Sequence, residues 1–247
     1  MAKLVWDLET ERTFETGVDR GVLYVKGKAD VANSDYEISG VSLGSTTVKS
    51  HYKEGVVWNG LTSVTENPSG AEANDIFADN IKYASIRSAE TFGGTIEAYM
   101  YPDAFKICDG SKEVATGVYV GQQSRTPFGF AFRTGKGDAS ENGIDVNTNY
   151  KLHLVYGATA SPSQSQYSTI NESPEAITFS WEFSTIPTSA GAAYKPTSLL
   201  TIDSSKLDSA GTTKLATLED VLYGTDGQGG HAGYLPDPDQ IVSFFKS

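Results

Sequence analysis

The sequence is poor in the residue types that most often bind metals. Cys108 is the only cysteine among 247 residues, so one chain cannot form an internal disulfide or a cysteine-based zinc site. The three histidines, His51, His153 and His231, also lack the short spacing typical of metal ligands. We therefore expect no metal or other cofactor, and a protein that works in a reducing compartment.

Basic side chains are scarce as well. Nineteen lysines and arginines face 31 aspartates and glutamates, which gives a formal net charge of -12. Such a charge repels phosphate backbones and argues against an ordinary nucleic-acid-binding role. Solubility alone is a sufficient explanation for it. The acidity would have a further role only if DNA had to pass the protein without adhering to it.

Long apolar runs are missing too. The segment Met1–Glu9 becomes charged before it develops an apolar core of signal-peptide length, and no later stretch approaches a membrane span. We therefore expect a protein that is made and used in the cytoplasm, away from any membrane.

What the sequence does contain favours an all-β fold. The hydrophobic fraction of 38% can supply a core, and 25 glycines with 9 prolines punctuate short segments. In the segment Ala176–Ser184, apolar residues alternate with polar ones, which predicts a strand. A hairpin with an extended tip is predicted from Phe128–Phe132 paired with Tyr150–Tyr156. Further strands are expected at Val22–Val25, Val56–Thr65 with a bulge at Gly60, Ile81–Ile86, Gly94–Tyr101 and Leu199–Ile202.

Helical signals are few. Thr212–Tyr223 predicts one helix, because Leu215, Leu218 and Leu222 share a face, and Gly224 ends it. Pro102–Cys108 predicts one or two helical turns. The expected fold is all-β with minor α: an antiparallel β-sandwich or barrel with one flanking helix.

The remaining segments are expected to be long loops and arms. They are Lys28–Glu54, Glu66–Asn80 and Thr225–Ser247, the last of which ends in an apolar cluster. We expect one domain over residues 1–247, in which 1–20 form an N-terminal arm, 21–224 the core and 225–247 a C-terminal arm.

Three short motifs could carry chemistry, and each has a plainer explanation. Ser42 has the spacing of a nucleophile elbow, but the residues after it are β-prone, so a loop is favoured. Asp138, Ser140, Asn142 and Gly143 fit a calcium loop, yet Asn149 stands where a bidentate carboxylate is needed. Lys136 lacks the glycine spacing of a phosphate loop. We expect no catalytic site.

Long ordered segments of the sequence carry a more specific signal. The following segments are similar to one known family: Trp58–Glu72, Ala78–Tyr83, Ser88–Tyr99, Tyr101–Asp103, Cys108–Gly110, Leu154–Gly157, Ser173–Glu182, Leu200–Asp203 and Leu222–Thr225. In these segments the chain resembles the major tail protein family of siphophages that infect Gram-positive bacteria. The resemblance extends from about Gly21 to the C-terminus.

The resemblance implies a structural protein of the virion tail, assembled in the bacterial host cytoplasm and without catalytic residues. It implies hexameric rings that stack into a tube for DNA ejection, with an acidic lumen that does not bind the DNA specifically. The implied partners are further copies of the chain, the tape measure protein, and the tail terminator and distal tail proteins.

A tube requires edge strands that pair across subunits and arms that reach the next ring. Our candidate contacts between subunits are Glu66, Pro68, Glu72, Phe77, Asp79, Phe244 and Phe245. The plainer alternative is that these segments are surface loops.

Two alternative functions remain. A receptor- or carbohydrate-binding module could use the 13 tyrosines and 3 tryptophans as stacking platforms. An enzyme would need a nucleophile such as Ser42.

Overall fold

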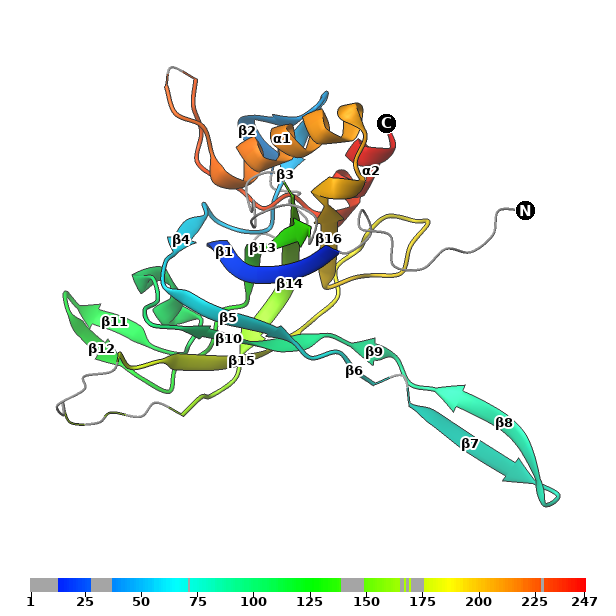
Figure 1. Cartoon of the computed structure of the whole chain (residues 1–247). Helices are drawn as coiled ribbons and strands as arrows, with labels where there is room; N and C mark the ends of the chain where they lie inside the picture. Colours follow the sequence, from blue (N-terminus) through cyan, green and yellow to red (C-terminus); the bar gives the residue numbers. More distant parts are fainter. Residues whose placement is uncertain are drawn as a thin grey trace.

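The structure is a computed structural model that describes residues 13–27, 37–70, 72–138, 149–164, 167, 169, 176–227 and 229–247. It is mostly β with antiparallel sheets and two α-helices in the described part, which confirms the predicted fold class (Figure 1). No described helix is both long enough and apolar enough to span a membrane.

An eight-stranded antiparallel sheet forms the body. Its strands run in the order β4-β1-β13-β14-β15-β10-β5, and β16 pairs with β14 beside β15. Their bounds are β1 Thr13–Val25, β4 Val56–Trp58, β5 Leu61–Glu66, β10 Gly93–Ala98, β13 Phe128–Asp138, β14 Tyr150–Ala160, β15 Phe179–Thr185 and β16 Leu199–Asp203. The first and last strands, β4 and β5, are consecutive in the chain, so the sheet curls into a barrel.

The corner between β4 and β5 corrects one expectation. Val56–Thr65 was predicted as a single strand with Trp58 and Leu61 on opposite faces. Gly60 instead has a φ of 77°, a conformation that glycine adopts without strain, and the chain changes partner from β1 to β10 there. Trp58 and Leu61 therefore pack into the same core.

The barrel interior is rich in aromatic side chains. The Trp58 ring lies 4.6 Å from Phe105, 5.5 Å from Phe130 and 5.6 Å from Trp181, measured between ring centroids. Its Nε1 donates a hydrogen bond to the Met100 carbonyl oxygen at 3.0 Å. Phe105 comes from a 3-10 helix, Asp103–Ile107, where the sequence predicted a helical turn. Tilted and edge-to-face rings of this kind stabilise a core beyond their buried area.

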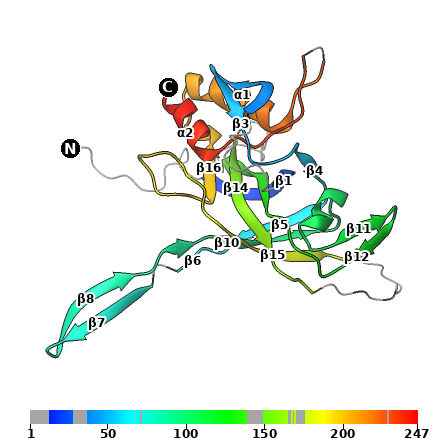
Figure 2. The same ribbon diagram turned by 180° about the vertical axis from the view of Figure 1, so that it is seen from behind.

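A second core lies between the barrel and a layer of helices. Along β1, Leu23 and Val25 face the barrel interior, whereas Val22 and Tyr24 face the helical layer. The layer contains α1 Ser209–Tyr223, α2 Pro238–Lys246 and the hairpin of β2 Glu37–Leu43 with β3 Thr46–Lys49. Figures 1 and 2 show these elements together on one side of the barrel.

Helix α1 follows the predicted pattern. Leu215, Leu218 and Leu222 are all buried, and Gly224 ends the helix with a φ of 83°. The helix begins three residues earlier than predicted, because the Asp208 side chain caps it by accepting a hydrogen bond from the Gly211 amide at 2.7 Å.

Several expected loops and arms are regular structure instead. Residues 37–49 of the expected Lys28–Glu54 loop form β2 and β3, with Val41, Leu43 and Val48 buried. Residues 13–20 of the expected N-terminal arm pair with β13 as part of β1. The expected C-terminal arm contains α2, a second flanking helix.

Three short two-stranded pairs extend beyond the barrel. Their strands are β6 Ser69–Gly70 with β9 Glu90–Thr91, β7 Ala73–Ala78 with β8 Ile81–Arg87, and β11 Lys112–Ala115 with β12 Val118–Val120. The predicted strand Ile81–Ile86 is thus confirmed as β8. The predicted hairpin of β13 and β14 is confirmed as well, although its tip, residues 139–148, lies outside the described residues.

Candidate assembly surfaces

The most prominent surface feature is a long two-stranded arm, residues 67–92. It continues β5 and β10 outward through the β6–β9 pair to the β7–β8 hairpin, and it projects away from the body (Figure 1). The Asn67 amide donates to the Gly93 carbonyl oxygen at 2.8 Å where the arm leaves the barrel. The prediction of a loop over Glu66–Asn80 was therefore wrong, because cross-strand pairing with residues 81–91 makes strands of this stretch.

The arm reverses direction in a two-residue turn at its tip. Asp79 and Asn80 have φ angles of 51° and 64°. Positive φ at both central residues defines the type I′ turn, whose twist matches that of a hairpin, and Asp and Asn tolerate this conformation better than most residues. The turn fixes the register in which Ala78 faces Ile81.

The register gives the arm one apolar and one polar face. Paired residues share a face, and the pairs Ile76 with Ala84, Ala78 with Ile81, and Asn74 with Ile86 lie on the same side. We call this side, with Ile76, Ala78, Ile81, Ala84 and Ile86, the isoleucine face.

The opposite side of the arm is held by polar contacts. Lys82 Nζ lies 2.8 Å from Asp75 Oδ1. Hydrogen bonds from Lys82 and Ser85 hold the pKa of the Asp75 carboxyl below its ordinary value. Phe77 is the large exposed hydrophobic residue of β7 on this side.

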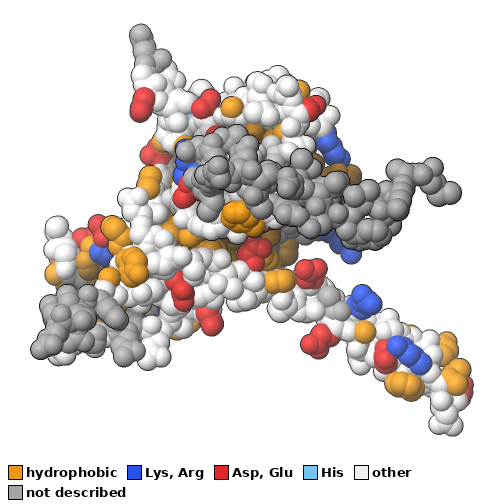
Figure 3. Space-filling view, viewed as in Figure 1, with side chains coloured by type: hydrophobic (Ala, Val, Ile, Leu, Met, Phe, Trp, Pro, Cys, Tyr) orange, Lys and Arg blue, Asp and Glu red, His pale blue; other side chains and the backbone are white. Residues whose placement is uncertain are grey.

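The arm's apolar side chains are open to solvent. The exposed fraction is 64% for Ile81 and 57% for Ile86, and orange side chains gather over the end of the arm in Figure 3. Burying one such side chain is worth roughly 1.5–3 kcal/mol. Isolated two-stranded ribbons are only marginally stable. Covering the isoleucine face with another apolar surface would therefore lower the free energy.

The structure brings most of the predicted contact residues to this arm. Pro68, Glu72, Phe77 and Asp79 are all exposed along it, and Phe77 is 67% exposed. Glu66 lies at its base, at the end of β5. Whether these residues contact another subunit stays a prediction.

The other two predicted contact residues lie elsewhere, in α2. Phe244 and Phe245 are partly buried against the second core of their own chain, next to the fully buried Ile241. Gln240 ties the helix to β3, since its Oε1 accepts from the Lys49 amide at 2.7 Å and its Nε2 donates to the Thr47 carbonyl at 3.0 Å. We expected this apolar terminus to be an arm that contacts other copies. In the structure it packs against the core of its own chain.

A histidine and a glutamate meet at the base of the arm. His153 is stacked on Phe132 at 4.6 Å, and its Nδ1 lies 3.1 Å from Glu66 Oε1. Its Nε2 lies 3.0 Å from Thr134 Oγ1. Burial lowers the pKa of His153, and the Glu66 carboxylate only partly offsets this effect. The contact joins the start of the arm to β14.

The outer surface of β5, β10 and β15 is a polar sheet face without basic residues. These three strands contain no lysine or arginine. Alternation points Ser63, Thr95, Glu97, Ser180 and Glu182 away from the barrel core. Ser63 donates to Glu97 Oε2 at 2.8 Å. We call this surface the polar sheet face; it presents hydroxyl groups and carboxylates.

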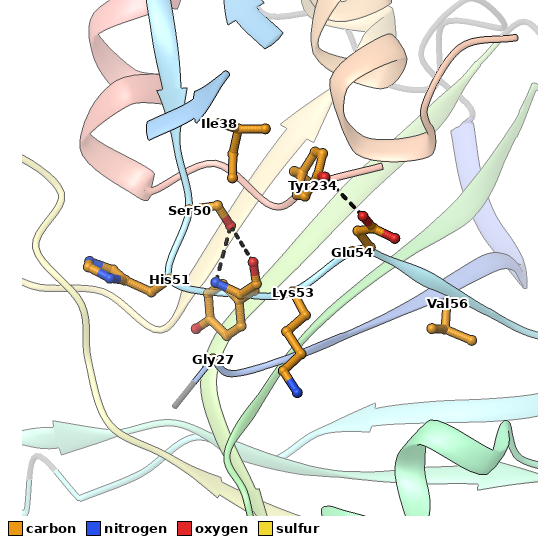
Figure 4. Close-up of a pocket in the computed structure, with 9 residues that line it drawn as sticks. Gly27, Ile38, Ser50, His51, Lys53, Glu54, Val56 and Tyr234 are labelled. Atoms are coloured by element: carbon orange, nitrogen blue, oxygen red, sulfur yellow. Dashed lines mark hydrogen bonds between the residues drawn. The ribbon is translucent and has the colours of Figure 1, made fainter. Parts of the chain in front are cut away.

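A hollow of about 550 Å³ lies beside the helical layer (Figure 4). Ser50, which lines it, donates to the Leu235 carbonyl oxygen at 2.6 Å. The side chain of His51, which also lines the hollow, points away from Ser50 in Figure 4. Tyr234 donates to Glu54 at 3.3 Å. The serine is hydrogen-bonded to backbone and has no histidine oriented toward it, so Ser50 is not paired with a base.

The other sequence motifs gain no catalytic geometry. Ser42 lies in β2 opposite Thr47, and the chain returns as a strand rather than entering the helix that a nucleophile elbow requires. The calcium-loop residues Ser140, Asn142 and Gly143 lie outside the described residues. Within the described chain, no cluster of three potential metal-ligating side chains occurs.

Sequence reasoning missed the isoleucine face. Ile76, Ile81 and Ile86 lie on both sides of the Asp79–Asn80 turn, and each was seen only within its own segment. The two-residue turn pairs Ala78 with Ile81, but a regular continuation from it would place Ile86 on the opposite side. The register shift between Ile76 and Phe77 pairs Ile76 with Ala84 and so brings the three isoleucines to one side.

Neither a scan against protein-family models nor a search of curated proteins finds a match to this chain.

Proposed function

We propose that this protein is the main structural subunit of a phage tail tube, in which copies of the chain form stacked hexameric rings around a lumen that conducts DNA. The proposal rests on the family resemblance of the sequence and on the arm. A curled antiparallel sheet with a helical layer on one side is compatible with the fold that the resemblance implies.

The observation that carries the proposal is the uncovered isoleucine face of the arm. A protein that worked alone would gain nothing from exposing three isoleucines to water on one side of a two-stranded ribbon. Exposed apolar clusters of this kind mark protein contacts. A self-assembling protein uses such an arm to reach a neighbouring copy.

The distribution of acidic residues on the polar sheet face supports its assignment as the wall of a DNA-conducting lumen. The polar sheet face offers Glu97 and Glu182 without any basic partner on the same strands. A carboxylate surface without cations repels phosphate, so DNA could slide past it. We assign this face to the lumen wall.

The alternative of a carbohydrate-binding module finds less support. Trp58 and Trp181, two of the three tryptophans, are buried in the barrel interior, so they cannot stack on a sugar. Trp6 lies outside the described residues.

Electron microscopy of the purified protein tests the proposal. We expect rings or tubes from the parent chain and none from the triple variant Ile76→Ser, Ile81→Ser, Ile86→Ser, whose circular dichroism should match the parent. Val57→Ser with Ile186→Ser is the matched control, because both residues are exposed and apolar but lie off the arm. A parent protein that stays monomeric and binds glycans would contradict the proposal.

A further inference from the structure

A second exposed apolar hairpin lies at the other end of the molecule. In β11–β12, Val114, Val118 and Val120 are 61%, 53% and 45% exposed. Lys112 pairs with Val120 and Ala115 pairs with Val118, so these four residues lie on one side, and the register shift between Glu113 and Ala115 leaves Val114 as the extra residue of β11. We call the side with Val118 and Val120 the valine face.

The hairpin has a fixed orientation on the body. Tyr119, on its other side, lies under the Lys106 ammonium of the 3-10 helix, with Nζ 3.9 Å from the ring centroid. Lys106 is held in turn by Asp103, whose Oδ1 lies 2.7 Å from Nζ. The tyrosine therefore anchors the hairpin while the valine face points away from the body.

We propose that the valine face of one copy is the docking surface for the isoleucine face of the arm of another copy. This inference rests on the proposed function and specifies which surface receives the arm. Each face is one side of a twisted two-stranded hairpin and carries β-branched aliphatic side chains. Two such hairpins can pack face to face when their side chains interdigitate.

Charge identifies a second copy as the occupant. The chain carries a net charge of -12, so two copies repel unless they meet through neutral regions. Residues 73–89 of the arm contain two acids, Asp75 and Asp79, and two bases, Lys82 and Arg87. Residues 106–120 likewise contain Lys106 and Lys112 against Asp109 and Glu113. These two hairpin segments therefore carry no net charge, although the full arm, residues 67–92, also contains Glu72 and Glu90, so two copies can meet through the hairpins without the repulsion that their overall charge creates.

The placement of the two hairpins favours repetition. They project toward opposite ends of the molecule in both views (Figures 1 and 2). A contact between two different surfaces leaves one arm and one valine face free in the resulting dimer, so the same contact can be repeated until it closes a ring or builds a filament.

Disulfide trapping tests the docking surface directly. In a Cys108→Ser background, which removes the only native cysteine, Ile81→Cys on one chain is mixed with Val118→Cys on a second chain that carries a mass tag. After oxidation we expect the mixed dimer in about tenfold excess over the pairing of Ile81→Cys with Ile186→Cys, because docking raises the local concentration of the matched thiols. Ile186 is 71% exposed and lies at neither hairpin.

A charge exchange provides a second readout that needs no oxidation. Val118→Glu is expected to abolish assembly in the parent background, and Ile81→Lys in the partner position is expected to restore it, whereas Ile186→Glu leaves assembly intact. If tubes form but residues 81 and 118 do not cross-link, and if Val118→Glu does not prevent tube formation, the valine face is not the docking surface. The proposed function would remain in that case. A parent chain that forms neither rings nor tubes would overturn the proposed function itself.

Discussion

His153 is the residue whose surroundings bear most directly on stability near neutral pH. The imidazole is buried between Phe132, Thr134 and the Glu66 carboxylate. Lys151 and Glu15, which form an ion pair of their own nearby, also act on it electrostatically. Because burial disfavours the charged ring, its pKa in the folded protein is lower than in an unfolded chain.

This shift predicts how stability depends on pH. As the pH falls through about 6.5, the unfolded chain takes up a proton at His153 before the folded protein does. The free energy of unfolding should therefore decrease with falling pH in this window and level off below the folded-state pKa. His153→Gln should reduce that slope in urea denaturation at a series of pH values. An unchanged slope would contradict the assignment. The same substitution at the half-buried His231 controls for the loss of an imidazole elsewhere in the chain.

Arg133 poses a different electrostatic problem, because its side chain is only 3% exposed. Two hydrogen bonds to Asp19, at 3.2 and 3.1 Å, and the Tyr150 ring, 4.3 Å from Cζ, compensate its charge. Asp19→Ala should leave a buried cation short of partners and lower the free energy of unfolding by about 1–3 kcal/mol. Chemical denaturation measures this loss. The exposed Asp226→Ala serves as control, and an equal effect of both variants would refute the role of Asp19.

At the scale of elements, α2 shows how an apolar terminus can be satisfied within its own chain. Ile241 is fully buried between α1, β2 and the barrel. Placing a charge there should detach the helix, so Ile241→Asp is expected to cost about 2–5 kcal/mol of stability. Phe245→Ser, at a half-buried position on the same helix, should cost less. Thermal denaturation of monomeric protein compares the two, and equal small losses would show that α2 does not depend on this packing.

The arm and the α2 helix differ in one physical respect. Ile241 is buried in the core of its own chain. Ile81 and Ile86 are exposed, because the strand register places them on the open side of the projecting arm. The first is a folding contact and the second, in our proposal, an assembly contact. Substitutions in the two elements should accordingly separate loss of stability from loss of assembly.

At the scale of the whole molecule, the surface charge is expected to keep the lumen of the proposed tube from binding DNA. Tubes of the parent protein should not retain DNA, whereas Glu97→Lys with Glu182→Lys should make them bind it in a salt-dependent manner, because each new cation neutralises phosphate and releases counterions. Filter binding at low and high salt measures this. Lysines at Glu113 and Asp226, which lie off the polar sheet face, should have a smaller effect. Equal binding by both variants would contradict the assignment of the lumen wall.

The sequence by itself determined the elements with strong local periodicity. The alternation of Phe179, Trp181 and Phe183 specified β15, the three phenylalanines of residues 128–132 specified β13, and the leucines of residues 215–222 specified α1. It also grouped Pro68, Glu72, Phe77 and Asp79 in one segment, Glu66–Asn80, although as a loop rather than as strands. In each case the information lies within a few neighbouring residues.

Only the tertiary structure decided what depends on distant partners. Residues 37–49 and 69–78 have weak strand signals, and they became strands because hydrogen bonds to their pairing partners outweigh local propensity. Gly60 closed the barrel by sending two halves of one predicted strand to different neighbours, and α2 found its site on α1 and β2. The isoleucine face likewise arises from register, since a shift by one residue would move each side chain of a strand to the opposite face.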